Sequence, residues 1–193
     1  MRIKVKIEGT RPCMLNRFSE KSAVSATNGT SEVLKSNANL TPQQEAEQGI
    51  YYDSTGKQPI VPMPNMFACL REAGKYHKIG KKTVTTQKSS MLNAYVEIEE
   101  LEIPIVSSTG WHPDTRPVRN PNTNGRFLKS RPMWNVWSLE FTLRVDNNFD
   151  IKLLRNIVDD AGLKIGFGEY RIANKGYFGT FKVIKWEILK EAK

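Results

Sequence analysis

Residues 150–189 read DIKLLRNIVDDAGLKIGFGEYRIANKGYFGTFKVIKWEIL, and this stretch decides the fold. Asp150 is a favourable helix cap, and the apolar residues after it recur at helical spacing as far as Gly162, which ends the predicted helix. Residues 163–179, here called the glycine loop, contain four Gly. The pattern of residues 180–189 then predicts a strand, so a helix, a glycine loop and a last strand follow one another.

Upstream of this stretch, the apolar patterns predict three more strands and one more helix. The strands fall at residues 2–8, 94–105 and 134–145, and the helix runs from 63 to about 78. The resulting order, β-α-β-β-α-β, is that of the ferredoxin-like split βαβ fold, which is also the RRM-like arrangement. The sequence therefore predicts an α+β protein with a ferredoxin-like core.

Two long connections interrupt this order, at residues 10–50 and 107–132. In the first, residues 19–40 are rich in Ser, Thr, Asn and Ala and are predicted to be mobile, and a short helix follows at 41–49. The second is rich in Pro, Gly and Arg and is predicted to be a long loop or a distorted hairpin. Connections of this length are usually functional or disordered. We expect one domain, residues 1–193, with two insertions.

Charge is the least ordinary property of the composition. The 193 residues contain 29 Lys and Arg against 20 Asp and Glu, a net charge of +9. Such a balance favours polyanionic partners, either nucleic acid or an anionic membrane surface. The two Cys, Cys13 and Cys69, are too few for a disulfide framework, and no apolar run is long enough to cross a bilayer. We expect a cytoplasmic protein that does not associate with a membrane.

The glycine loop is the first candidate binding element. Its Gly residues permit positive φ and close backbone approach, so exposed N–H groups could meet phosphates beside a cation. The alternative is a tight connection between helix and strand. The order helix–loop–strand is the reverse of a dinucleotide-binding motif. The candidate residues are Gly166, Gly168, Arg171, Lys175 and Gly176.

Residues 111–137 are the second candidate, because cations and aromatic residues interleave there as in single-strand binders. The predicted phosphate contacts are Arg116, Arg119, Arg126, Lys129 and Arg131. Trp134 and Trp137 would point to opposite faces of a strand, so one is expected in the core and the other partly exposed to stack a base. The alternative is a solvated basic loop with tryptophans in the core.

Arg71 is the third candidate, because it lies on the predicted helix with Lys75, Lys78, Lys81 and Lys82 close behind. This group could flank a phosphate path, or it could be an ordinary solvated helix end.

Catalytic patterns are missing from the sequence. The two His, His77 and His112, are far apart, and no metal-ligand spacing or nucleophile motif is present. We expect no catalytic residues, no metal and no cofactor. The enzymatic alternative is a metal-independent endoribonuclease that uses His77 or His112 as a general base.

Two segments resemble the RAMP superfamily, the RNA-binding proteins of CRISPR systems. Residues 165–168 and 176–181, IGFG and GYFGTF, resemble the glycine-rich loop of that family, and residues 60–71, IVPMPNMFACLR, resemble its strand–Pro–helix segment. Residues 7–15 and 131–137 are also similar to small phage and prophage proteins of unassigned function.

The resemblance implies a ferredoxin-like RNA-recognition core and assembly along a nucleic-acid strand. We therefore expect a protein that binds single-stranded RNA, or DNA, mainly through its backbone. Its partners would include further copies of itself or other RAMP-like subunits. A phage protein that binds a host protein is a further alternative.

Overall fold

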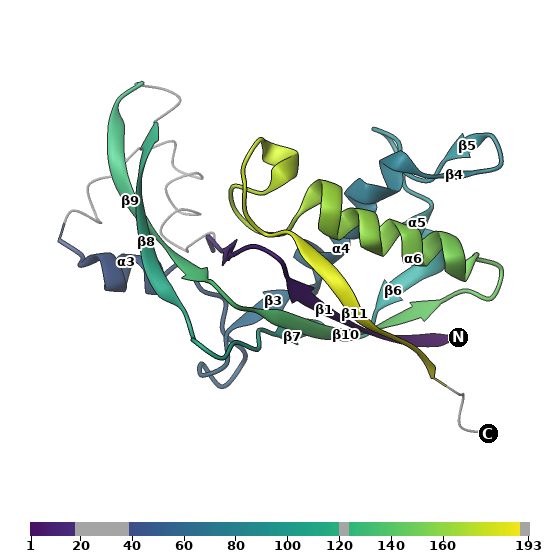
Figure 1. Ribbon diagram of the computed structural model, residues 1–193, viewed down its shortest axis with the longest axis horizontal. Coiled ribbons are helices and arrows are strands. Elements are labelled where there is room, and N and C mark those ends of the chain that lie inside the picture. Colours follow the sequence, from purple (N-terminus) through teal and green to yellow (C-terminus); the bar gives the residue numbers. More distant parts are fainter. Residues whose placement is uncertain (18–38, 120–123, 190–193) are drawn as a thin grey trace.

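A four-stranded antiparallel sheet forms the centre of the molecule (Figure 1). The structure is a computed structural model and describes residues 1–17, 39–119 and 124–189. The sheet has the order β11-β1-β10-β6, where the strands span Phe181–Leu189, Arg2–Gly9, Ser138–Val145 and Val96–Ile98. Every neighbouring pair is antiparallel. The first and last strands of the chain therefore lie side by side.

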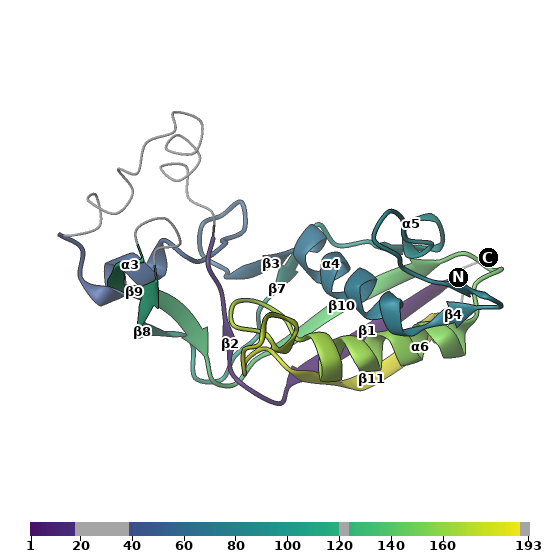
Figure 2. The same ribbon diagram turned by 90° about the horizontal axis from the view of Figure 1, so that it is seen from above.

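Two helices, α4 (Met63–Ala73) and α6 (Ile151–Asp160), cover one face of this sheet (Figure 2). Alternate residues of β1, namely Ile3, Val5 and Ile7, face them and are 0% exposed. This is the half-buried pattern that alternation along the strand predicts. Asp150 caps α6 as expected, because its side chain accepts a hydrogen bond from the backbone N–H of Lys152.

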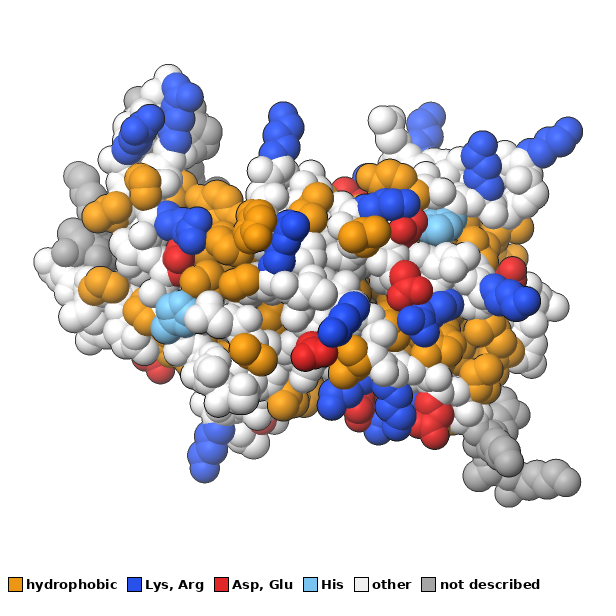
Figure 3. All heavy atoms as spheres, viewed as in Figure 1, with side chains coloured by type: hydrophobic (Ala, Val, Ile, Leu, Met, Phe, Trp, Pro, Cys, Tyr) orange, Lys and Arg blue, Asp and Glu red, His pale blue; other side chains and the backbone are white. Residues whose placement is uncertain are grey.

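The other face of the sheet is charged and internally paired. Lys4 on β1 lies 2.7 Å from Glu140 on β10, and Lys185 on β11 lies 2.8 Å from Glu187. Cationic and acidic side chains consequently intermingle in this part of the surface (Figure 3). Exposed pairs of this kind add little stability, but they leave this face without a large excess of charge.

A long hairpin extends from the sheet at one end of the molecule (Figure 1). Its strands are β8 (His112–Arg119) and β9 (Arg126–Trp134), which pair along their whole length. Short strand β2 (Cys13–Met14) pairs with β9. Helix α3 (Pro42–Glu47) packs on the hairpin and carries the predicted capping box, made by Thr41 with Gln44. Of the two forms predicted for the second insertion, the hairpin is the one observed.

Short elements fill the connections. β3 (Ile60–Pro62) pairs with β7 (Glu102–Pro104), and β4 (Lys78–Ile79) pairs with β5 (Lys82–Thr83). The remaining helical turns are α5 (Leu92–Tyr95), η1 (Gly74–Tyr76), η2 (Ala161–Ile165) and η3 (Ile172–Asn174). The mobility predicted for 19–40 falls mostly outside the described residues. None of the helices in the described ranges is both long and apolar enough to cross a membrane.

Three boundaries were predicted wrongly. Residues 94–105 do not form one strand. Helix α5 ends at Tyr95, and β6 and β7 follow it as two separate short strands. Residues 134–145 are not one strand either, since Trp134 ends β9 and a bend precedes β10. The last helix does not end at Gly162 but continues as a π-helical turn to Gly166, where φ is +74°. Gly162 instead allows close packing, because a Cβ there would lie 2.2 Å from the carbonyl oxygen of Phe181.

Candidate nucleic-acid interface

The glycine loop is tightly folded on itself. The carbonyl oxygen of Tyr170 would lie 1.7 Å from a Cβ at position 176, and the carbonyl oxygen of Met14 would lie 2.3 Å from a Cβ at position 168. Distances below 3.0 Å cannot be accommodated without a backbone shift, so these two positions require Gly for the packing of the chain itself.

The backbone N–H groups of this loop are mostly used inside the protein. Gly166 donates to the carbonyl of Ala161 at 2.9 Å, and Gly176 donates to the carbonyl of Arg171 at 3.0 Å. The prediction that Gly166 and Gly176 present free N–H groups to phosphates is therefore wrong. The alternative, a tight connection, describes the loop better, and Lys175 lies exposed on it in a left-handed conformation, with φ +60°.

Beside the loop, the exposed flank of α4 borders two adjoining hollows of about 290 and about 630 Å³. Both hollows are lined by Ala68, Glu72 and Arg171, so they adjoin along these residues, and the two together are here called the α4 groove. Its walls come from α4 and α5, from residues 15–16 and Tyr51, from the start of the glycine loop and from residues 85–90. The charged and amide side chains on these walls are Asn16, Asn65, Arg71, Glu72, Lys75, Gln87, Lys88, Asn93, Glu169 and Arg171.

Cations outnumber carboxylates in the α4 groove. Glu72 serves two of them, at 3.4 Å from Lys75 and 3.8 Å from Arg171. Arg71 and Lys88 are exposed and make no ion pair within the ranges that the structure describes. The groove therefore has two cations available for an anionic ligand, and two more that share one carboxylate.

Small hydroxyl side chains surround these cations. Thr85 and Ser90 form a hydrogen bond of 2.8 Å that closes the base of the turn 85–90. Thr86 accepts hydrogen bonds from the backbone N–H groups of Lys88 and Ser89, which places Lys88 in the turn. The sequence run TTQKSS at 85–90 was not predicted as part of a site. The density of hydroxyl groups in this run was the only feature of the sequence that could have indicated a binding element.

Cys69 also lines the groove but has no chemical role there. Burial raises the pKa of its thiol to about 12, so it stays protonated and unreactive near neutral pH. Its side chain is 5% exposed, and its sulfur lies 3.3 Å from the carbonyl oxygen of Gly166.

The hairpin cations are only partly available. Arg116 makes two hydrogen bonds to Asp114, and its guanidinium lies 4.8 Å from the centre of the Phe178 ring. Arg131 is 6% exposed and lies 5.2 Å from the centre of the Tyr170 ring. Arg131 is therefore not the surface phosphate contact that was predicted, because it is buried against the Tyr170 ring of the glycine loop.

Arg119 and Arg126, by contrast, are exposed near the end of the hairpin, where Figure 3 shows cationic side chains standing out. Besides Arg116 and Arg131, a third arginine stacks on an aromatic ring of the glycine loop, and the sequence analysis did not predict it. Arg11 lies 4.1 Å from the centre of the Tyr177 ring, and only the fold brings these two residues together.

Trp134 and Trp137 are each 2% exposed, so the prediction that one of them is partly exposed and stacks a base is wrong. Trp137 packs on Phe167 and Phe181, with ring centres 6.4 and 6.3 Å apart, and its indole N–H donates to the carbonyl oxygen of Arg11 at 2.8 Å. The bend after Trp134 breaks the alternation on which the prediction relied, and both rings turn into the core.

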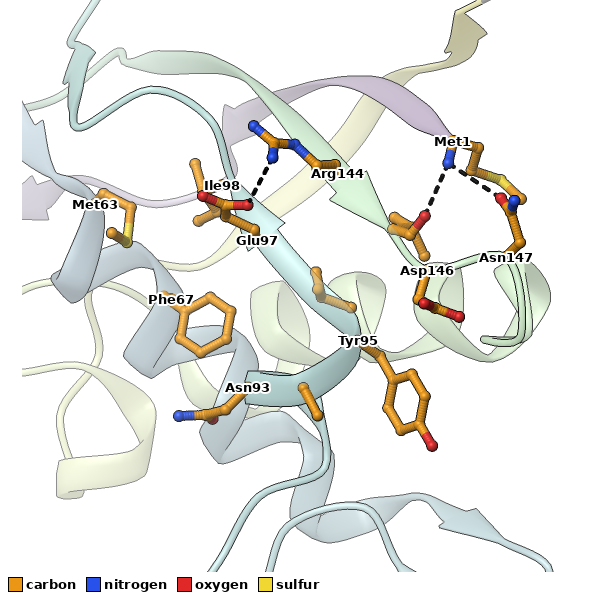
Figure 4. Close-up of a pocket in the computed structure, with 13 residues that line it drawn as sticks. Met1, Met63, Phe67, Asn93, Tyr95, Glu97, Ile98, Arg144, Asp146 and Asn147 are labelled. Carbon is orange, nitrogen blue, oxygen red and sulfur yellow. Dashed lines mark hydrogen bonds and ion pairs between the residues drawn. The ribbon is translucent and has the colours of Figure 1, made fainter.

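A further hollow of about 590 Å³ lies on another flank of α4, at the free edge of β6 (Figure 4). Met63, Phe67 and Ile98 form its apolar wall. Arg144, a cation at its rim, lies 3.4 Å from Glu97, and the N-terminal ammonium of Met1, which also lines the hollow, donates to the carbonyl oxygen of Val145 at 2.9 Å. This hollow lacks the unpaired cations of the α4 groove, so it is the weaker candidate for a polyanion.

His77 and His112 do not come together (Figure 3 shows the two rings far apart). The Nε2 atom of His77 lies 2.9 Å from Asp160, which also binds Lys164 at 2.7 Å. Neither histidine lines one of the hollows described above. Within the described ranges, no three His, Cys, Asp or Glu side chains form a group that could hold a metal ion.

The fold and the groove define a mixed α/β protein with an antiparallel sheet and a cationic depression beside one of its helices. No family model and no curated protein matches the sequence. The chain is similar in structure to a chain of the Type III-B Cmr-beta complex bound to cognate target RNA, with a TM-score of 0.59 and 13% identity. The match covers 99% of this chain and 61% of that one, so this chain spans about three fifths of its neighbour. At this identity, the likeness is one of fold.

Proposed function

We propose that this chain binds single-stranded RNA, mainly through the phosphate backbone, in the α4 groove. The observation that carries the proposal is the exposure of Arg71 and Lys88, which line the same hollow and have no carboxylate partner among the described residues. The net charge of +9 and the likeness to a chain of an RNA-bound complex support it. DNA is the alternative ligand of the same chemistry.

Arg71 offers a planar fork suited to two phosphate oxygens, and Lys88 offers a compact point charge. The amide of Asn65 and the hydroxyl groups of residues 85–90 suit sugar and phosphate oxygens. No described helix or strand presents a row of side chains for reading base edges, so little sequence preference is expected. The charged outer face of the sheet is self-paired and is therefore the less suitable surface.

The sheet order β11-β1-β10-β6 with two helices on one face matches the split βαβ arrangement, and we propose a ferredoxin-like, RAMP-like core. On this basis several copies would line up along one strand. In this arrangement the exposed Arg119 and Arg126, at the end of the hairpin, would contact the strand bound by a neighbouring copy. Mass measurement on strands of increasing length tests this, since one copy at every length would contradict it.

We also propose that the chain does not cleave RNA. His77 has the carboxylate partner that a general base needs, but its imidazole is largely buried, with 14% of the side chain exposed. Incubation of labelled single-stranded RNA and DNA with the protein, followed by gel separation, tests binding and cleavage together. Retarded, intact RNA is expected. Cleavage that is lost in His77→Ala would favour the endoribonuclease, and failure to retard any strand would contradict the proposed function.

A further inference from the structure

Arg131 carries a positive charge that is buried inside the protein. It is 6% exposed, and its Nε and Nη1 atoms are buried with no hydrogen-bond partner among the residues that the structure describes. Buried charged groups are nearly always paired, because an unpaired guanidinium loses its hydration without compensation. The ring of Tyr170 faces the guanidinium at 5.2 Å, but a stacked ring leaves the in-plane N–H groups unsatisfied.

A second cation lies next to it. Lys129 and Arg131 are two residues apart on β9, so their side chains project from the same face of the hairpin. Burial, and then the charge of Arg131, lowers the pKa of Lys129. Two cations held close together in a partly desolvated environment repel each other unless an anion lies between or beside them.

The nearby carboxylates are otherwise engaged or too distant. Asp114 faces Arg131 across the hairpin but is bound by Arg116 through two hydrogen bonds. Glu45 accepts the backbone N–H of Ser130 at 2.9 Å. Glu45 and Glu169 influence Lys129 electrostatically, yet neither approaches Arg131 or Lys129 within ion-pair distance in the described ranges.

The loop that covers Arg131 is held in an unusual conformation. Tyr170 has φ +50°, a left-handed value that aromatic residues rarely adopt, and strain of this kind is often stored at binding sites. The close approach of Gly176 to the Tyr170 carbonyl and the hydrogen bond from Phe178 N–H at 3.0 Å hold it there. The ring of Tyr170 is thus fixed over the guanidinium.

We propose that Arg131 and Lys129 form an oxyanion site, enclosed between β9 and the glycine loop, that takes a phosphate group. The free N–H groups of Arg131 match two oxygens of a tetrahedral anion, and Lys129 supplies a second charge. The phosphate is either inorganic phosphate or one phosphodiester of a bound strand. Neither Lys129 nor Arg131 lines the α4 groove. Binding of free phosphate here does not rest on the proposed function, whereas binding of a strand phosphodiester does.

Thermal unfolding in sodium phosphate and in sodium chloride at equal ionic strength tests the site, with inorganic phosphate as the probe. Phosphate stabilises most proteins weakly because it is excluded from their surface. Binding at the site is therefore judged from the difference between variants in the gain in melting temperature. Lys152→Met is the control, because Lys152 is an exposed cation on α6, outside the hairpin. The wild type and Lys152→Met should gain several degrees in phosphate, and Arg131→Met and Lys129→Met should lose most of that gain.

An equal gain in the wild type, Arg131→Met and Lys129→Met would overturn the proposal. If Arg131→Met does not fold, Arg131→Lys replaces it, since it keeps the charge but loses the fork, and a gain equal to that of the wild type again overturns the site. Calorimetric titration of inorganic phosphate into the protein saturated with single-stranded RNA shows whether the site takes free phosphate or a phosphodiester of the strand. Loss of phosphate binding assigns the site to a strand phosphate, and unchanged binding assigns it to free phosphate. Arg71→Ala with Lys88→Ala, which should weaken RNA binding, should leave the phosphate response intact.

Discussion

The carbonyl oxygen of Tyr170 occupies the space where a side chain of residue 176 would begin, 1.7 Å from an ideal Cβ. Gly176 is therefore required by the folding of the glycine loop. We expect Gly176→Ala to lower the free energy of unfolding by about 3 kcal/mol or more, because backbone must move to admit the methyl group. Urea unfolding measures this.

Gly80→Ala provides the control for that experiment. Gly80 has φ +60° and no atom near the added Cβ, so its replacement costs only the left-handed conformation, about 1 kcal/mol. If Gly176→Ala were no more destabilising than Gly80→Ala, the close packing of the loop would be wrong.

Trp137 is predicted to act in the core and not on the nucleic acid. Trp137→Ala should cost about 3–5 kcal/mol of stability, as truncation of a buried large aromatic residue does. Trp137→Phe should fold and bind RNA with unchanged affinity, measured by fluorescence anisotropy with a labelled strand. A folded Trp137→Phe protein that binds RNA tenfold more weakly would show that Trp137 contributes to RNA binding.

RNA binding is expected to fall steeply with salt. Each phosphate neutralised on a single strand contributes roughly −0.7 to the slope of log K against log salt concentration, so the two available cations of the α4 groove, Arg71 and Lys88, give roughly −1.4. Lys88→Ala should reduce the magnitude of that slope by somewhat less than one unit. Equilibrium titrations at several salt concentrations check both values, and a flat response would exclude a backbone contact.

Glu99 should contribute to stability in a pH-dependent way. Hydrogen bonds from the side chain of Arg2 lower the pKa of Glu99 below its unfolded value. The stabilisation is therefore present above the unfolded pKa of Glu, near ~4.3, and is lost as the pH falls through the folded pKa. Glu99→Gln should flatten the acid side of the stability curve. An unchanged curve from pH 6 to pH 3 would show that this pair contributes nothing.

The local patterns predicted most of the elements of the sheet and both covering helices, because alternation and helical spacing reflect which side of each element is buried. They failed where the chain bends. The spacing of Trp134 and Trp137 predicts opposite faces of one strand, but the bend between them turns both rings inward. Spacing within an element carries no information about such a bend.

The candidate site was predicted in parts only. Arg71 and Arg171 were selected for separate reasons, and the fold brings both to one groove. Lys88 was missed, since its position beside them depends on the packing of residues 85–90 against α4. Arg131 was selected as a cation, but its burial against Tyr170 depends on a contact between segments about 40 residues apart.

The central claim is that RNA lies in the α4 groove, and charge reversal there tests it most directly. Arg71→Glu with Lys88→Glu should raise the Kd for a labelled single-stranded RNA by more than tenfold, which corresponds to about 1.4 kcal/mol. Lys57→Glu with Lys152→Glu, at two exposed lysines outside the groove, changes the net charge by the same amount and should change the Kd less than twofold. An equal loss in both proteins, or none in the groove variant while it remains folded, would contradict the account.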